Sequence, residues 1–352
     1  MRYPMSRRSF LSAAAGVAAA ARLGADAARA ARAAGDRPGP TVRDTFGLAK
    51  AGKKIPVVFD TDIGGDIDDT WALAMLLKSP ELDVKLVTSD SGNDTYRARI
   101  LAKMLEVAGR TDVPVGIGCR PGDKKGRQSA WLGDCDLARY PGTVHQDGVG
   151  AIIDTIRASR DPITLVAIGP VPNLAEVLRR APDVARRARF VGMHGSVRRG
   201  YGGSREISAE YNVRACPEGL QAVFAAPWEV SVTPLDTCGI VHLEGAKYQK
   251  ILRCKDPVVE ALVANYRAWC AARGGKRVPD PDERSSTLFD TVAVYMAFTE
   301  KLLGMETLPL RVTDDGFTNI DPAARPVRCA MQWKDLPAFE DELVRRLTST
   351  KG

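Results

Sequence analysis

The feature that most constrains this chain is a single stretch, residues 57–77, with the sequence VVFDTDIGGDIDDTWALAMLL. It opens with three apolar residues, as a buried parallel strand does, and it ends in the apolar periodicity of a helix. The glycine-containing turn between them carries five carboxylates: Asp60, Asp62, Asp66, Asp68 and Asp69. A strand, an acidic turn and a helix in this order predict an α/β sheet with a ligand site at the carboxyl end of this strand.

Carboxylates at this density repel one another unless a cation or captured protons compensate their charge. Because the stretch contains neither His nor Cys, its oxygen ligands favour a hard ion, Ca²⁺ or Mg²⁺. An ordinary helix N-cap accounts for Asp66 or Asp68 but not for all five acids. An EF-hand loop is excluded, since Gly64 and Trp71 stand where that loop needs acidic ligands. The pattern therefore predicts a metal site.

Apolar strand patterns and helical periodicity alternate along the rest of the chain. Strands are predicted near residues 84–88, 113–118, 163–168, 189–193, 229–233, 308–312 and 325–330. Helices are predicted near residues 97–108, 149–156, from 174 onwards, 256–273, 287–303 and 336–347. This alternation predicts an α/β fold, with a single domain whose mostly parallel, open sheet is flanked by helices around a Rossmann-like core.

The N-terminus has the features of a targeting segment. Residues 6–11, SRRSFL, resemble the twin-arginine export signal, the small apolar residues 12–21 follow, and Ala28-Arg29-Ala30 offers a cleavage site. The apolar run is too short for a stable membrane anchor. We expect export by the twin-arginine pathway to a periplasmic or extracellular location. The chain is divided accordingly into a signal peptide (1–30), a linker (31–52) and a folded domain (53–352).

The net charge of +7 does not indicate nucleic-acid binding. Residues 1–30 carry five Arg and one Asp, so the rest of the chain, with 45 basic and 42 acidic residues, has a net charge of only +3. These remaining basic residues are scattered in short clusters, as is typical of solvated helix and loop positions. The seven Cys residues show neither a C-x-x-C pair nor a zinc-binding spacing.

Further motifs follow the later strands, and together with the acidic turn they resemble the inosine–uridine-preferring nucleoside hydrolases. That family usually opens with D-T-D-P-G-x-D-D before an apolar helix. Its other motifs recur here in the same order, from about residue 55 to residue 300: Gly92-Asn93, His145–Gly148, Ile168-Gly169-Pro170 with Asn173, Met193-His194-Gly195, Ala209–Asn212 and Asp290. The resemblance identifies 53–352 as a catalytic domain of this type.

The resemblance implies a Ca²⁺-dependent enzyme that splits a ribonucleoside into ribose and free base, and that assembles as a homodimer or homotetramer. The implied metal ligands are Asp62, Asp69, Asp290 and the backbone carbonyl of Ile168. Asp62 would also take a proton from the attacking water. The implied substrate contacts are Asp68, Asn93, Glu210 and Asn212 at the ribose, His145 near the base, and Met193.

Three departures from the family pattern bear on the chemistry. The acidic turn is two residues longer, so either Asp62 or the additional Asp66 could be the base, and we favour Asp62. Ser204 stands where some members carry Asn. Phe289 stands before Asp290, where purine-active members carry a His that protonates the leaving base. His194, which replaces the first Gly of the more usual M-G-G, is a candidate substitute for that acid. The base preference is not predicted.

Two other functions are compatible with parts of the sequence. A non-catalytic nucleoside- or ribose-binding protein could retain the Ca²⁺ site, and Phe289 and Ser204 favour this alternative. A haloacid-dehalogenase-like phosphatase would use Asp60 as nucleophile with Mg²⁺, because residues 59–62 resemble its D-x-D opening. That family also needs a late acidic pair, for which Asp314-Asp315 is poorly placed.

Overall fold

The structure is a computed structural model that describes residues 39–91, 94–119, 126–274 and 278–349. The predicted signal peptide and Asn93 lie outside these described residues. Within them, no helix has the length and apolar content that a membrane crossing requires.

A ten-stranded sheet forms the centre of the domain, in the order β4-β3-β2-β1-β5-β6-β7-β10-β8-β9. The strands are β1 (Ile55–Thr61), β2 (Leu82–Ser89), β3 (Val115–Ile117), β4 (Val144–His145), β5 (Ile163–Ala167), β6 (Ala188–Met193), β7 (Val230–Thr233), β8 (Leu303–Val312), β9 (Thr318–Ile320) and β10 (Pro326–Trp333). Only the pairings of β8 with β10 and β9 are antiparallel. The predicted single α/β domain with a mostly parallel sheet is confirmed.

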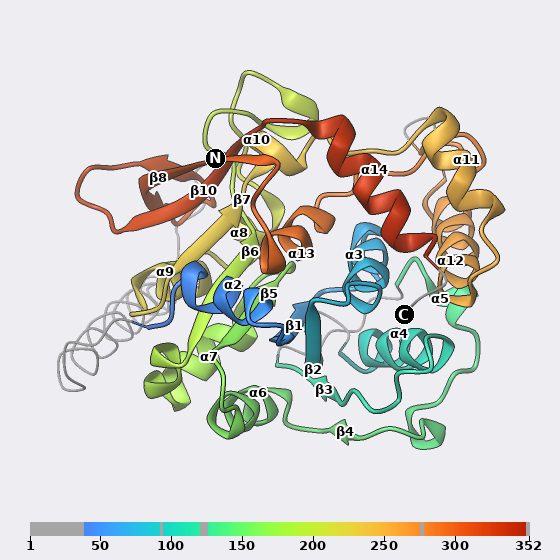
Figure 1. Cartoon of the computed structure of the whole chain (residues 1–352), viewed down its shortest axis with the longest axis horizontal. Helices are drawn as coiled ribbons and strands as arrows, with labels where there is room; N and C mark the ends of the chain where they lie inside the picture. The colour runs from blue at the N-terminus through green and yellow to red at the C-terminus, as the bar shows by residue number, and fades with distance from the viewer. Residues whose placement is uncertain (1–38, 92–93, 120–125, 275–277, 350–352) are drawn as a thin grey trace, which may run out of the picture.

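The direction in which successive strands are added to the sheet reverses at β1, and the candidate site lies at this switch point. The chain runs from β1 through β2 and β3 to β4 on one side, and then from β5 through β6 to β7 on the other (Figure 1). The carboxyl end of β1 therefore lies between the ends of β2 and β5. In open α/β sheets the loops diverge at such a switch point and leave a crevice for a ligand. The acidic turn emerges at this position.

Helices cover both faces of the sheet (Figure 1). They are α2 (Val42–Lys50), α3 (Asp68–Leu77), α4 (Asp94–Val107), α5 (Ser129–Leu132), α6 (Gly148–Ala158), α7 (Pro172–Arg180), α8 (Tyr211–Ala215), α9 (Pro217–Ala225), α10 (Leu235–Cys238), α11 (Gly245–Arg253), α12 (Pro257–Arg273), α13 (Thr291–Phe298) and α14 (Leu336–Leu347). Because side chains alternate along a strand, Val57 and Phe59 of β1 join the core beneath α3, α4 and α13, whereas Val58 joins the core beneath α6, α7 and α9.

Two segments differ from the sequence prediction. Residues 42–50, assigned to a linker, form α2, which begins with a capping box between Thr41 and Asp44 and docks through the Val42 amide onto Glu229 Oε1 at 2.7 Å. The helix predicted at 287–303 is shorter and spans Thr291–Phe298. It ends where Thr299 adopts an extended conformation, and the chain then enters β8.

Candidate active site

The acidic turn is held in a tight, buried conformation between β1 and α3. Asp62, Asp68 and Asp69 are at most 8% exposed. Gly64 has a φ of +102°, and a Cβ there would lie 2.5 Å from the Tyr96 ring, so both the backbone conformation and the packing require glycine. The turn therefore directs Asp62, Asp68 and Asp69 into the interior at the carboxyl edge of the sheet.

A carboxylate cluster forms where the start of α3 meets the start of α13. Oxygen atoms of Asp68, Asp69 and Asp290 all lie within 4.8 Å of one another. Burial, together with the charges of neighbouring acids, raises the pKa of each of the three carboxyls well above its usual range. A divalent cation would relieve the same repulsion. Because the donors are all oxygens, the cluster fits a hard ion such as Ca²⁺ or Mg²⁺.

Asp62 and Asp66, the two candidates for the base, have different surroundings. Burial raises the pKa of Asp62, although the guanidinium of Arg97, 3.9 Å away, and a hydrogen bond with Asp69 oppose the rise. The Asp66 side chain is 47% exposed and lies 3.8 Å from Arg273. Asp62 is thus buried beside Asp69 of the cluster, whereas Asp66 lies at the outer edge of the turn.

The ends of β5 and β6 meet beside Asp62. The carbonyl of Ile168 accepts a hydrogen bond of 2.9 Å from Asn212 Nδ2, which also donates to the Met193 carbonyl at 3.0 Å. A Cβ on Gly169 would lie 2.8 to 2.9 Å from atoms of Asp62, so the Ile168-Gly169 backbone packs directly against that residue. The structure therefore brings the predicted carbonyl ligand next to Asp62.

Glu210 caps the first turn of α8. Its Oε1 accepts from the Asn212 amide at 2.8 Å, and its Oε2 accepts from the amides of Gly195 and Val213 at 3.1 and 3.2 Å. Burial raises the pKa of Glu210 to about 7. The carboxylate therefore holds the loop after β6 against α8, at the rim where a substrate contact is predicted.

Two other predicted positions lie further out. His145 is exposed on the edge strand β4, and β3 and β2 separate it from β1. Ser204 is exposed, and its hydroxyl accepts a hydrogen bond from the Glu206 amide at 3.1 Å. The structure thus groups Asp62, Asp68, Asp69, Asp290, Ile168, Met193, Glu210 and Asn212 and leaves these two at the periphery.

His194 cannot replace the missing acid. It is 1% exposed, and its Nε2 lies 3.0 Å from the Gly169 carbonyl. A carbonyl only accepts, so Nε2 carries the proton. Burial lowers the pKa of His194 to about 4, and the imidazole is therefore neutral near pH 7. These properties argue against His194 as the acid that protonates the leaving base, because its buried, neutral ring is hydrogen-bonded to the backbone beside Ile168.

Several supporting residues escaped the sequence analysis or were not assigned a role. Thr61 donates a hydrogen bond to Asp69, and Thr88 donates one to Asp60. Asn173 Nδ2 donates to Asp60 Oδ1 at 2.8 Å and to the Ser89 carbonyl at 2.9 Å. Burial raises the pKa of Asp60 to about 6, and this carboxyl lies beneath the cluster with 2% exposure. Its burial is unfavourable for a phosphatase nucleophile.

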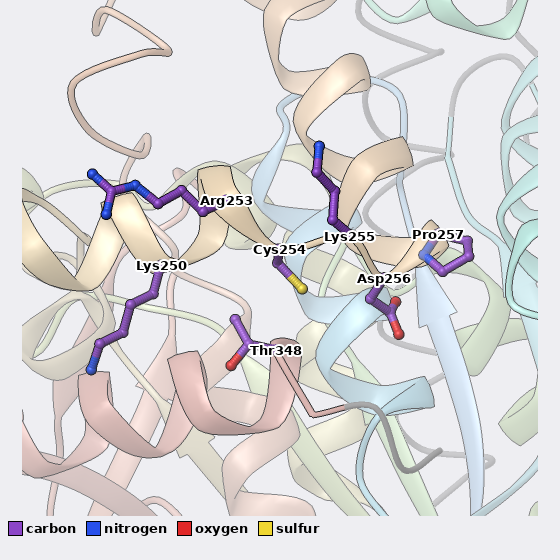
Figure 2. A pocket seen from close by; sticks show the side chains of 7 residues that line it. All are labelled: Lys250, Arg253, Cys254, Lys255, Asp256, Pro257 and Thr348. Atoms are coloured by element: carbon purple, nitrogen blue, oxygen red, sulfur yellow. The ribbon is translucent and has the colours of Figure 1, made fainter.

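A cavity of about 700 Å³ lies elsewhere, between the end of α11, the start of α12 and the end of α14. Its lining contains none of the acidic residues of the cluster. Figure 2 shows the side chains of Lys250, Arg253 and Lys255 pointing away from one another, so they do not converge on a common ligand. The carboxylate cluster at the switch point therefore remains the candidate active site.

Buried oxygen ligands at the switch point of an α/β sheet suit a hydrolytic enzyme that uses a metal ion. A family model described as inosine-uridine preferring nucleoside hydrolase matches residues 57–339. The chain belongs to this family. It is therefore an enzyme that hydrolyses the N-glycosidic bond of ribonucleosides to ribose and free base.

Sequence relatives agree with this membership, and solved structures share the fold. The chain is 32% identical over 219 residues to a pyrimidine-specific ribonucleoside hydrolase of Citrobacter koseri, covering 58% of this chain and 67% of the relative. The corresponding protein of an Enterobacter species is 31% identical over 227 residues, which cover 59% of this chain and 68% of the relative. A plant nucleoside hydrolase has the same fold, with a TM-score of 0.71, 22% identity and coverage of 84% of this chain and 99% of that one. A purine-preferring ribonucleoside hydrolase of Gardnerella vaginalis also shares the fold, with a TM-score of 0.67 and 21% identity. The match covers 83% of this chain and 98% of that one.

Proposed function

We propose that hydrolysis by this protein depends on Ca²⁺ held at the switch point. The observation that carries this proposal is the cluster of Asp68, Asp69 and Asp290, whose oxygens lie within 4.8 Å of one another in a buried setting. Asp69, Asp290, Asp62 and the Ile168 carbonyl would hold the ion. When bound, Ca²⁺ would lower the pKa of the attacking water and fix ribose hydroxyls.

Asp62 is proposed as the residue that accepts the proton of that water. Its carboxylate is buried, interacts with Asp69 and faces the Arg97 guanidinium, which favours its ionised form. Asp66 is half exposed and pairs with Arg273, so its carboxylate is partly neutralised at the outer edge of the turn. The surrounding carboxylates would also stabilise the positive charge that develops on the sugar ring as the bond to the base breaks.

Pyrimidine ribonucleosides are the proposed substrates. Two relatives with 31–32% identity are named pyrimidine-specific. Phe289 cannot protonate a leaving base, and the family resemblance places a proton-donating His there only in purine-active members. Asp68, Glu210 and Asn212 are proposed to contact the ribose, with Met193 beside them, and His145 is proposed to lie near the base.

Export and assembly stay predictions. The twin-arginine pattern supports export to the periplasm or the exterior. A homodimer or homotetramer is proposed from the resemblance alone.

A reducing-sugar assay tests the proposed function. The purified protein would be supplied with uridine, cytidine, inosine and adenosine, first as isolated, then after chelation, and then with Ca²⁺ or Mg²⁺ restored. We expect ribose release that chelation abolishes and Ca²⁺ restores, with uridine and cytidine preferred. Tight Ca²⁺ binding without ribose release would favour the binding protein, whereas phosphate release from a generic ester would favour the phosphatase.

A further inference from the structure

The backbone of the acidic turn is held from outside by an unbroken series of side-chain donors. Four consecutive carbonyls each accept a hydrogen bond from a different residue: Ile63 from Arg97 Nη1 at 2.8 Å, Gly64 from Tyr96 Oη at 3.3 Å, Gly65 from Trp269 Nε1 at 3.2 Å and Asp66 from Gln128 Nε2 at 2.8 Å. Within the described part of the chain, these donors come from α4, from α12 and from the residue before α5. We call these four residues the turn clamp.

Gln128 connects the clamp to its surroundings. It is fully buried, and its Oε1 accepts from Asn265 Nδ2 of α12 at 2.8 Å and from Thr70 Oγ1 of α3 at 3.3 Å. Its main-chain amide donates to Tyr96 Oη at 2.9 Å. One amide side chain therefore joins the turn to α12 and to the first turn of α3, where Asp68 and Asp69 lie.

The clamp holds the segment that connects Asp62 to Asp68 and Asp69, which must act together at the site. The turn separates Asp62 from Asp68 and Asp69 and contains Gly64 and Gly65, so without external contacts it would have many accessible conformations. Ordering such a segment only when an ion binds would reduce the affinity by the entropy lost. Relative to the usual family motif the turn is two residues longer, which increases this freedom.

We propose that Arg97, Tyr96, Trp269 and Gln128 are positioning residues that set the separation of Asp62 from Asp68 and Asp69 and thereby set the affinity of the site for a divalent cation. None of the four is placed at the reacting atoms. The inference rests on the proposed function in one respect, the binding of Ca²⁺ to this cluster. Loss of residues that orient metal ligands typically weakens metal binding by 10- to 100-fold.

Conservative variants can remove the polar groups of the clamp while retaining the packing. Trp269→Phe removes the indole N–H, and Tyr96→Phe removes the hydroxyl. Matched controls remove a donor of the same kind from a bond elsewhere: Trp228→Phe, whose Nε1 donates to the Val223 carbonyl at 2.8 Å, and Tyr248→Phe, whose Oη donates to the Pro281 carbonyl at 2.7 Å. Both controls are buried, so each loses a buried hydrogen bond as the clamp variants do, while Tyr96→Phe also leaves the Gln128 amide without its acceptor.

The experiment is calorimetric titration of Ca²⁺ into the metal-free protein, with Tm measured for every variant and uridine kinetics at several Ca²⁺ concentrations. We expect Tyr96→Phe/Trp269→Phe to bind Ca²⁺ about tenfold more weakly. Activity at low Ca²⁺ should fall, and saturating Ca²⁺ should restore most of it. Trp228→Phe/Tyr248→Phe should also lower Tm but bind Ca²⁺ like the wild type.

Two results would overturn the proposal. Equal Ca²⁺ affinity in the clamp variant, the control variant and the wild type would show that the clamp only stabilises the fold. If the double variant does not fold, Trp269→Phe alone decides between the same outcomes. A wild-type protein that hydrolyses uridine but binds no Ca²⁺ would overturn the calcium dependence and the effect of the clamp on it, and would leave the hydrolase activity itself intact.

Discussion

Phe289 packs edge-to-face against Tyr201, with ring centroids 6.0 Å apart and planes at 83°. Phe289 immediately precedes Asp290 of the carboxylate cluster. Tyr201 is 45% exposed, and its hydroxyl accepts a hydrogen bond from the Tyr211 amide at 2.9 Å. An aromatic pair thus stands beside the cluster at the position where a purine-active relative would present an acid. The Phe289 ring itself offers apolar contact to a base but, unlike a His, no proton.

Phe289→His should extend the activity towards purine nucleosides. A protonated imidazole next to Asp290 could donate a proton to the leaving base, and general acids contribute about 10²- to 10⁴-fold. We expect kcat/KM for inosine to rise by about tenfold or more, with a smaller change for uridine. Because the acid form is required, the gain should diminish above the pKa of the new His. Phe289→Leu, which adds no acid, is the control, and an equal gain in that variant would refute the explanation.

Asp62→Asn should lower kcat for uridine by about 10³-fold, since a general base typically contributes 10²- to 10⁴-fold. Asp66→Asn should remain close to the wild type, because that side chain is half exposed and paired with Arg273. Steady-state kinetics at saturating Ca²⁺ provide the measurement. The opposite pattern, with activity lost only in Asp66→Asn, would transfer the role of base to Asp66.

Asp69→Asn should abolish the stabilisation of the protein by Ca²⁺. A ligand that binds only the native state raises its stability by about 2.7 kcal/mol at a concentration of 100 times Kd. Wild-type Tm should therefore rise with Ca²⁺ and fall after chelation, while the variant should show one Tm under both conditions. Asp314→Asn, at an exposed position, is the control and should respond like the wild type. A retained response in Asp69→Asn would exclude Asp69 as a ligand.

His194 should make the protein less stable in mild acid. Burial lowers its pKa to about 4, whereas the unfolded chain takes up the proton near the ordinary value of 6.5. Stability is therefore fully present above pH 6.5 and is lost as the pH falls towards 4. Between pH 7 and pH 5 this residue should account for about 2 kcal/mol.

The measurement for His194 is the free energy of unfolding by urea at pH 7 and pH 5. His194→Gln retains an N–H donor for the Gly169 carbonyl but does not titrate, so its loss between the two pH values should be smaller by that amount. An identical loss in both proteins would mean that His194 is protonated in the folded state or does not contribute.

Asn173→Ala should destabilise the protein by about 3 kcal/mol. Asn173 makes no hydrogen bond to Asp68, Asp69 or Asp290 among the described residues. The substitution leaves Asp60 and the Ser89 carbonyl without their amide donor, and the Cys119 amide without the acceptor that lies at 2.8 Å. Asn319→Ala on the exposed strand β9 should change stability by less than about 0.5 kcal/mol. Unfolding in guanidinium chloride compares the two, and a similar small effect in both would show that the buried network contributes little.

Much of the fold was predictable because its signals are local. The apolar strand, the two glycines and the helical periodicity after Asp69 lie within one stretch, and α14 begins and ends at the predicted residues. The alternation of strands and helices likewise implied a parallel sheet. The sequence prediction was wrong where contacts between distant segments determine the structure. Helix α2 forms within the expected linker, where the Val42 amide donates to Glu229. Helix α13 ends earlier than predicted because the chain then enters β8.

The sequence by itself determined that a dense group of carboxylates stands at the carboxyl end of a buried strand, since neighbours along a turn remain neighbours in any fold. Only the tertiary structure decided which acids converge. It brings Asp290 to Asp68 and Asp69, turns Asp66 outward and buries His194 as a neutral support. The turn clamp is equally invisible in the sequence, because Trp269 and Gln128 reach the turn only after α12 and the segment before α5 pack against it. Contacts between distant segments depend on the packing of the whole domain, and no local pattern records them.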